Sequence, residues 1–181
     1  GRCMNGNILE DLERAAARVP ERVAFLDDQT ALTFAQLHHQ ARAVGSCLMD
    51  VMPPRGVAAV LMDGRSMTCV PAFLGVAYAG GAYAPLDPAM PAERLAVILE
   101  RMRPDCVLTD DKGRRAMSAL TSVTAPVVDF ADAVETAVRS EALAAVRARS
   151  GMFDPLSILY TSGSTGIPKG SIQSHASYIH Y

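Results

Sequence analysis

The sequence lacks the patterns that mark metal-binding, disulfide-bonded and nucleic-acid-binding proteins. Its four cysteines, Cys3, Cys47, Cys69 and Cys106, lie 44, 22 and 37 residues apart, with no C-x-x-C pair and no cluster of histidines. This spacing indicates neither a zinc site nor a disulfide framework, and isolated cysteines in apolar segments are typical of core residues. A reducing, cytoplasmic compartment fits them best. The net charge is −2 and there is no basic run, which argues against nucleic acid as the main partner.

No membrane association is expected either. The residues from Gly1 to Asn7 lack a basic region followed by an apolar run, so no secretory signal peptide is visible. The 21 residues from Ser66 to Leu86 carry no charge, which is close to the length that spans a bilayer. However, Pro71, the Gly80-Gly81 pair and Pro85 interrupt this stretch. A buried helix, a tight turn and a buried strand therefore explain it better than a membrane helix.

The order of apolar patterns predicts an α/β fold. Half of the residues are apolar, 20% are charged and no repeat is evident, as expected of a globular chain. Thr33 and Gln36 form a capping box, which places a helix start there. We expect helices over 8–19, 34–49, 66–79, 91–102 and 131–149, a helix start near 175, and strands over 23–26, 31–32, 57–62, 82–86, 106–109, 126–129, 156–160 and 171–174. Strands that alternate with helices predict a mostly parallel sheet with flanking helices, preceded here by an N-terminal helix and hairpin.

The segment from Thr161 to Gly170 has the composition of a phosphate-binding loop. Four hydroxyls, three glycines and one lysine occupy these ten residues, and the apolar run 158–160 predicts a buried strand that delivers them. Glycines let the backbone adopt φ > 0 and present N–H groups to an anion, while lysine adds a flexible charge. The spacing disfavours a P-loop NTPase, because Lys169 lies three residues after Gly166 and a glycine follows it.

The T-S-G-S-T-G-x-P-K-G pattern resembles the phosphate loop of the adenylate-forming (AMP-binding) superfamily. Residues 79–88, A-G-G-A-Y-A-P-L-D-P, with P-A-E-R-L at 91–95 and L-T-F-A-Q-L at 32–37, are most similar to blocks of the amino-acid adenylation domains of nonribosomal peptide synthetases. The similarity runs in order from about Asn7 to Tyr181. Four positions depart mildly from these blocks: Phe34, Gln36, Tyr78 and Met90.

This resemblance implies an ATP-dependent ligase. Such domains join an amino acid or another carboxylate to ATP, giving an acyl-adenylate and pyrophosphate, and then load the acyl group on the phosphopantetheine thiol of a carrier protein. The resemblance implies ATP and Mg²⁺ as cofactors, with no metal ligand and no catalytic residue identifiable in this sequence. The residues that it implies for phosphate binding are Thr161, Ser162, Gly163, Ser164, Thr165, Gly166 and Lys169.

The resemblance also implies that residues 1–181 form the N-terminal portion of a large AMP-binding domain. The segments that bind adenine, ribose and magnesium, and the small C-terminal domain with its catalytic lysine, have no counterpart in the sequence. We therefore expect the 181-residue chain to be inactive alone. Two alternatives stay open: a fragment of an acyl-CoA or aryl-acid ligase, or a truncated, non-catalytic nucleotide-binding or scaffold protein.

Three other features are expected to be structural. His175 follows the phosphate loop closely, and we expect it to shape the start of a helix rather than to act as a base. The Asp110-Asp111 pair, with basic residues after it, predicts a solvated helix start rather than an acid/base pair. The glycines and prolines of residues 80–95 indicate tight packing turns.

Overall fold

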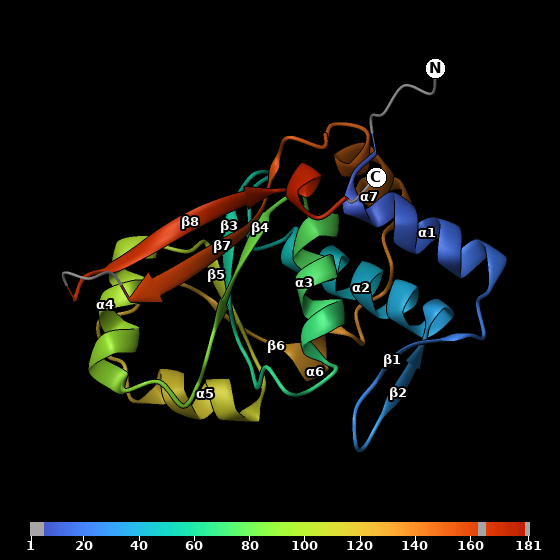
Figure 1. Ribbon diagram of the computed structural model, residues 1–181. Coiled ribbons are helices and arrows are strands. Elements are labelled where there is room, and N and C mark those ends of the chain that lie inside the picture. Colours follow the sequence, from blue (N-terminus) through green and yellow to red (C-terminus); the bar gives the residue numbers. More distant parts are fainter. Residues whose placement is uncertain (1–5, 163–165, 180–181) are drawn as a thin grey trace.

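The computed structural model describes residues 6–162 and 166–179 (Figure 1). Its helices are α1 (Ile8–Arg18), α2 (Phe34–Leu48), α3 (Cys69–Tyr78), α4 (Ala92–Met102), α5 (Asp111–Ser118), α6 (Phe130–Ala133), α7 (Ser140–Arg147) and the 3₁₀ turn η1 (His175–Ser177). Its strands are β1 (Val23–Leu26), β2 (Ala31–Thr33), β3 (Val57–Leu61), β4 (Ala82–Leu86), β5 (Cys106–Thr109), β6 (Val127–Asp129), β7 (Pro155–Ser162) and β8 (Pro168–Ser174).

Six of the strands form one sheet in the order β6-β5-β3-β4-β7-β8. The first five run parallel to their neighbours, and β8 is antiparallel to β7. The strands β1 and β2 form a separate antiparallel pair. The predicted α/β class, with a mostly parallel sheet, flanking helices and an N-terminal helix and hairpin, is confirmed.

Helices cover both faces of the sheet because the chain moves in opposite directions from its central strand. From β3 it crosses to β4 through α3, and from β4 it returns past β3 to β5 through α4. Since such crossovers are right-handed, the two connections place their helices on opposite faces. In Figure 1, α2 and α3 lie on one side of the sheet and α4 and α5 on the other.

The alternation along β3 divides the core between these two faces. Ala58 and Val60 belong to a cluster with residues of α2 and α3, including Val44 and Val76. Ala59 and Leu61 belong to a second cluster with residues of α4 and α5, including Leu95, Ile98, Leu99 and Met117. A strand that is apolar on both faces is expected in a sheet covered on both sides. Each buried leucine of this kind contributes roughly 1.5–3 kcal/mol to stability.

The N-terminal elements form as the sequence predicts. The Asn7 side chain accepts a hydrogen bond from the Leu9 N–H and caps α1, and both hydrogen bonds of the predicted capping box at Thr33 and Gln36 are present at the start of α2. Asp27 in the β1–β2 turn accepts hydrogen bonds from its own turn and, through Oδ2, from the N–H of Met67 at 3.0 Å. These N–H donors hold the pKa of Asp27 at about 2 and fasten the hairpin to the segment before α3.

The predicted helix over 131–149 is wrong, since the chain forms the short helices α6 and α7 there. Their apolar residues pack in different places: Phe130 and Ala133 join the cluster under α2 and α3, whereas Leu143 joins residues of α1 and α2. Between the helices, the Arg139 N–H donates to Ser46 Oγ of α2 at 3.0 Å. One straight helix cannot satisfy both packing sites, so tertiary contacts override the high helix propensity of this alanine-rich segment.

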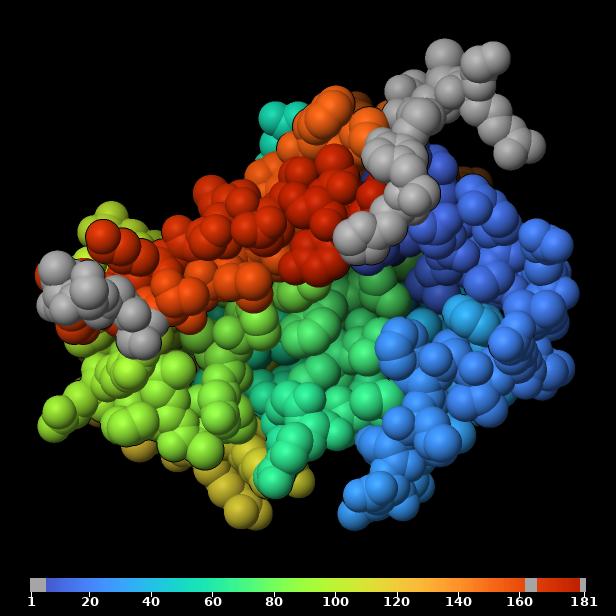
Figure 2. Space-filling model, in the orientation of Figure 1, coloured from blue at the N-terminus to red at the C-terminus, as the bar shows by residue number. Residues whose placement is uncertain are grey.

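The face shown in Figure 2 exposes α3 between the β7–β8 hairpin and the β1–β2 hairpin. An apolar groove of about 470 Å³ lies along α3, lined by residues of α1, α2, α3, β1, β4 and β7. Phe73 and Tyr83 stack in this groove with their ring centroids 4.4 Å apart. Within the described ranges, no helix has the length and apolar character needed to cross a bilayer.

Candidate functional site

The candidate phosphate-binding segment connects the two strands of a long hairpin. The strands β7 and β8 pair from Pro155 opposite Ser174 to Ser162 opposite Pro168. The hairpin joins the rest of the sheet through a single register pair, Tyr83 with Ser157, and extends toward α4 in Figure 1. Most of its length is therefore held by pairing between its own two strands.

The prediction that residues 158–160 form a buried strand is half right. They lie in β7, but Leu159 is 38% exposed, and Ile158 and Tyr160 are only partly buried. The reason is topological, because among the described residues β7 has one neighbour beyond it in the sheet, the edge strand β8. On one face, Tyr160 packs against the cluster of α4 and α5.

The predicted site residues that the structure describes meet at the outer end of this hairpin. Thr161 and Lys169 are register partners on the two strands, and both are exposed. Ser162 is paired with Pro168. Gly166 has φ = 74°, a left-handed conformation that glycine adopts without strain. The other predicted site residues, Gly163, Ser164 and Thr165, lie outside the described residues.

This geometry has the elements of an anion site. The pairing places a hydroxyl and an ammonium group on adjacent strands at the position where the connecting segment begins. Lys169 is a compact charge with three N–H donors on a flexible stem, so it can follow an anion. The left-handed Gly166 permits a tight return of the chain toward Lys169.

The opposite end of the hairpin is anchored to the body of the fold. Ser157 is fully buried, and its Oγ lies 2.9 Å from the hydroxyl of Tyr178. The N–H groups of His175 and Ala176 donate to the carbonyls of Asp154 and Met152, at 3.2 and 2.7 Å. These contacts fix the base of β7 and β8 to the body of the fold.

His175 has a structural position, as predicted, although it begins a three-residue 3₁₀ turn rather than a longer helix. Its side chain is 3% exposed, and Nδ1 accepts a hydrogen bond from the N–H of Ile8 at 3.3 Å. Burial lowers the pKa of His175 to about 4. The neutral imidazole therefore connects the hairpin base to the first turn of α1.

The Asp110-Asp111 pair also has the predicted structural role. Asp110 accepts from the Gly113 N–H at 2.8 Å and caps α5, while Asp111 is exposed and pairs with Arg114 at 2.6 Å. Of the cysteines that the structure describes, Cys69 and Cys106 are buried, as predicted for core residues, whereas Cys47 is only partly buried. Burial raises the pKa of their thiols to about 11 and about 12.

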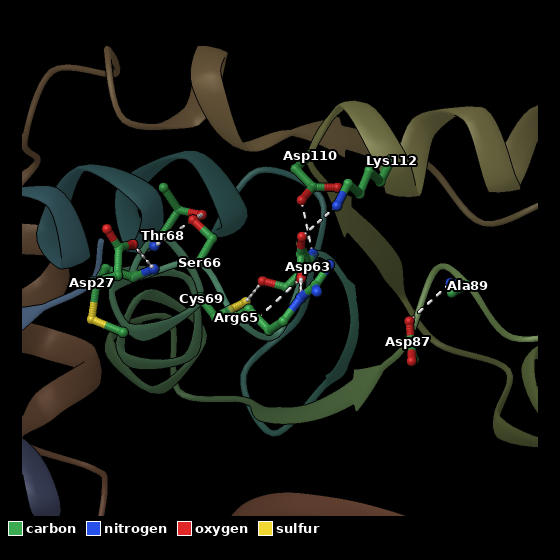
Figure 3. Close-up of polar contacts among 11 residues, drawn as sticks. Asp27, Asp63, Arg65, Ser66, Thr68, Cys69, Asp87, Ala89, Asp110 and Lys112 are labelled. Atoms are coloured by element: carbon green, nitrogen blue, oxygen red, sulfur yellow. Dashed lines mark hydrogen bonds and ion pairs between the residues drawn. The ribbon is translucent and has the colours of Figure 1, made fainter. Parts of the chain in front are cut away.

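Sequence reasoning missed a second polar site, a crevice at the carboxyl ends of β3, β4 and β5. We call it the switch crevice; its volume is about 890 Å³ and its charged lining consists of Asp63, Arg65, Asp87, Lys112 and Arg115. Figure 3 shows Asp63 receiving hydrogen bonds from Arg65 and Lys112. The signal was present in the sequence, because a charged residue closely follows each of these buried strands.

Comparison with known proteins places the chain in a family. The family model described as AMP-binding enzyme matches residues 12–181, so the chain belongs to the AMP-binding enzymes. Among curated relatives, it is 35% identical over 165 residues to the probable non-canonical nonribosomal peptide synthetase CymA of Salinispora arenicola. It is 33% identical over 174 residues to surfactin synthase subunit 1 of Bacillus subtilis. The relation to nonribosomal peptide synthetases predicted from the sequence blocks is thereby confirmed.

A solved structure shows the same relation. The nonribosomal peptide synthetase FmoA3, in its form bound to α-methyl-L-serine-AMP, matches with a TM-score of 0.78 and 27% identity. The match covers 97% of this chain and 19% of FmoA3. The two curated relatives are matched over 91% and 96% of this chain but over only 2% and 5% of their own length. The chain therefore spans a small part of each relative.

Proposed function

We propose that this chain is the N-terminal portion of the large domain of an amino-acid adenylation domain, and that it supplies the phosphate-binding loop. The parent protein would activate an amino acid with ATP to an aminoacyl-adenylate plus pyrophosphate. It would then load the product on the phosphopantetheine thiol of a carrier protein. The observation that carries this proposal is the pairing of Thr161 with Lys169 beside the left-handed Gly166, in a chain of the AMP-binding family.

The loop would act on the leaving group. When the carboxylate displaces pyrophosphate, negative charge increases on the β- and γ-phosphates, and fixed donors stabilise this charge. The hydroxyls of Thr161, Ser162, Ser164 and Thr165 and the charge of Lys169 would hold it, and Gly163 and Gly166 would permit the turn. Mg²⁺ would accompany ATP and neutralise part of the same charge.

Amino-acid-dependent exchange of pyrophosphate into ATP tests this proposal in the longer protein that contains the chain. Loss of one positioned donor at such a site costs roughly 10²- to 10³-fold in rate, so Lys169→Ala should lower exchange at least about 100-fold. Arg101→Ala removes a charge from an exposed position of α4 and serves as the control, with exchange unchanged. Equal exchange by the two variants would contradict the assigned role of Lys169.

The same assay separates the alternatives. Exchange supported only by fatty or aryl acids would favour an acyl-CoA or aryl-acid ligase, and no exchange with any acid would favour a non-catalytic protein. The 181-residue chain alone should support no exchange, because the segments implied for adenine, ribose and magnesium binding and the small domain have no counterpart in it. Exchange by the isolated chain would contradict its assignment as an incomplete domain.

A further inference from the structure

The β7–β8 hairpin carries the candidate phosphate-binding segment, but the sheet supports only its base. Its one register pair with another strand joins Ser157 to Tyr83 of β4. From Ile158 outward, β7 pairs only with β8 among the described residues, and Thr161 and Lys169 lie farther out. An isolated two-stranded hairpin is marginally stable in water, so contacts outside the ladder must hold this outer end in place.

Tyr160 supplies such a contact. Its side chain is partly buried and packs against the cluster of α4 and α5, which includes Leu86, Leu95 and Ile98. Among the described residues, no other member of β7 or β8 belongs to this cluster. The Tyr160 ring thus connects the outer half of the hairpin, which extends toward α4 in Figure 1, to the body of the fold.

The same ring covers Gly170 on the neighbouring strand. Tyr160 and Gly170 are register partners. A Cβ added at Gly170 would lie 3.1 Å from Cζ and 3.3 Å from Cε2 of Tyr160, and 3.1 Å from Cγ2 of Ile158. Gly170 is not among the described residues with positive φ, so the space taken by the ring is what requires glycine here. An aromatic ring over a glycine of the adjacent strand pins the register of the two strands.

This contact lies directly beside the residues assigned to phosphate. Tyr160 precedes Thr161 and Gly170 follows Lys169, so the two register pairs are neighbours in the ladder. Successive side chains of a strand point to opposite faces, which puts the Tyr160 ring on the face opposite to the Thr161 and Lys169 side chains. Tyr160 can therefore act on the ligand only through the strands.

We propose that Tyr160 is a positioning residue for the phosphate-binding loop. Its ring, held between the cluster of α4 and α5 and Gly170, sets the direction of the outer hairpin and thereby places Thr161 and Lys169 for the phosphates of ATP. This inference rests on the proposed function and adds to it a residue outside the predicted phosphate-binding set. The contacts that carry it are those of the ring atoms.

Pyrophosphate exchange into ATP by the longer protein that contains the chain tests this role. Tyr160→Leu removes the ring but keeps an apolar side chain. Because a displacement of about 1 Å can cost roughly 10²-fold in rate, Tyr160→Leu should lower exchange at least about tenfold. Tyr160→Phe keeps the ring and should exchange at the wild-type rate. Ile172→Thr, a β-branched replacement at a 64% exposed position of β8, is the matched control and should leave exchange unchanged.

The Lys169→Ala background distinguishes positioning from a general loss of stability. If Tyr160 acts through Lys169, then Tyr160→Leu should lose most of its effect when Lys169 is already alanine. A purely structural role would lower exchange by the same factor in both backgrounds, since independent effects add in free energy. Gly170→Ala displaces the same ring from the other strand and should behave like Tyr160→Leu in both backgrounds.

Three results would overturn the inference: wild-type exchange by Tyr160→Leu, an equal loss in both backgrounds, or a loss in Tyr160→Phe as large as that in Tyr160→Leu. Full exchange by Lys169→Ala would instead contradict the proposed function, so the two failures can be told apart. Thermal unfolding midpoints of the variants report directly that each is folded.

Discussion

Acidification should weaken the fold through His175, the buried imidazole that connects the hairpin base to α1. Its pKa in the folded chain is about 4, against about 6.5 for an exposed histidine. Between these values the unfolded chain binds a proton that the folded chain does not, so stability falls as pH decreases. The stabilisation is complete above pH 6.5 and lost below pH 4. A difference of about 2.5 units corresponds to roughly 3 kcal/mol.

The assay is urea unfolding of the wild type and of His175→Asn at several pH values from 4 to 8. Asparagine keeps an acceptor near the position of Nδ1 but does not titrate in this range, so the difference between the two curves isolates the imidazole. Other groups, including His38, whose pKa is also lowered by burial, contribute equally to both curves. His39→Asn, at an exposed position, is the matched control.

The free energy of unfolding of the wild type should fall by up to about 3 kcal/mol more than that of His175→Asn between pH 6.5 and 4. Asp154 lies near and favours the protonated form, while Arg147 opposes it. The observed figure is therefore the balance of burial and Arg147, which lower the pKa of His175, against Asp154, which raises it. Parallel pH dependences of the two proteins would refute the view that burial keeps this imidazole neutral.

Two further predictions concern packing and thiol reactivity. Gly113→Ala places a Cβ 1.8 Å from the Leu61 carbonyl oxygen, so thermal unfolding should show a loss of about 3 kcal/mol in the free energy of unfolding. The control Gly64→Ala, whose Cβ would have no atom within 4 Å, should lose under about 0.5 kcal/mol. Equal losses in the two variants would contradict the close contact of α5 with β3. Alkylation at pH 8 should modify the half-buried Cys47 at least about 100-fold faster than Cys106, because burial raises the pKa of the Cys106 thiol to about 12. Equal alkylation rates of the two thiols in the folded chain would contradict the burial of Cys106.

The sequence predicts the elements whose boundaries are set locally. The strands 82–86 and 106–109 and the capped start of α2 depend on apolar runs, turns and caps that lie next to each other in the chain. The break between α6 and α7 could not be predicted in this way. It depends on Ser46 and on two separate packing sites, neither of which is visible in the alanine-rich segment itself.

The two candidate sites also differ in how far the sequence predicts them, because one is local in the chain and the other is not. The candidate phosphate-binding segment is contiguous, so its composition and spacing are enough to propose it. The structure adds the register pairing of Thr161 with Lys169. The switch crevice combines residues from three separate parts of the chain, near 63, 87 and 112. Strand order brings them together, and strand order follows from packing over the whole sheet, so no single segment of sequence reveals the site.

The position of β8 has a consequence for how the protein behaves at high concentration. Within the described residues, β8 lies at the outer edge of the six-stranded sheet. Unpaired backbone groups along such a strand can pair with another chain, and Ile172, at 64% exposure, adds an apolar contact. Pro168 offers no N–H, and Lys169 places a charge on the same strand. The lysine assigned to phosphate thus also opposes edge-to-edge aggregation, and Lys169→Ala should increase concentration-dependent self-association while Lys169→Arg should not.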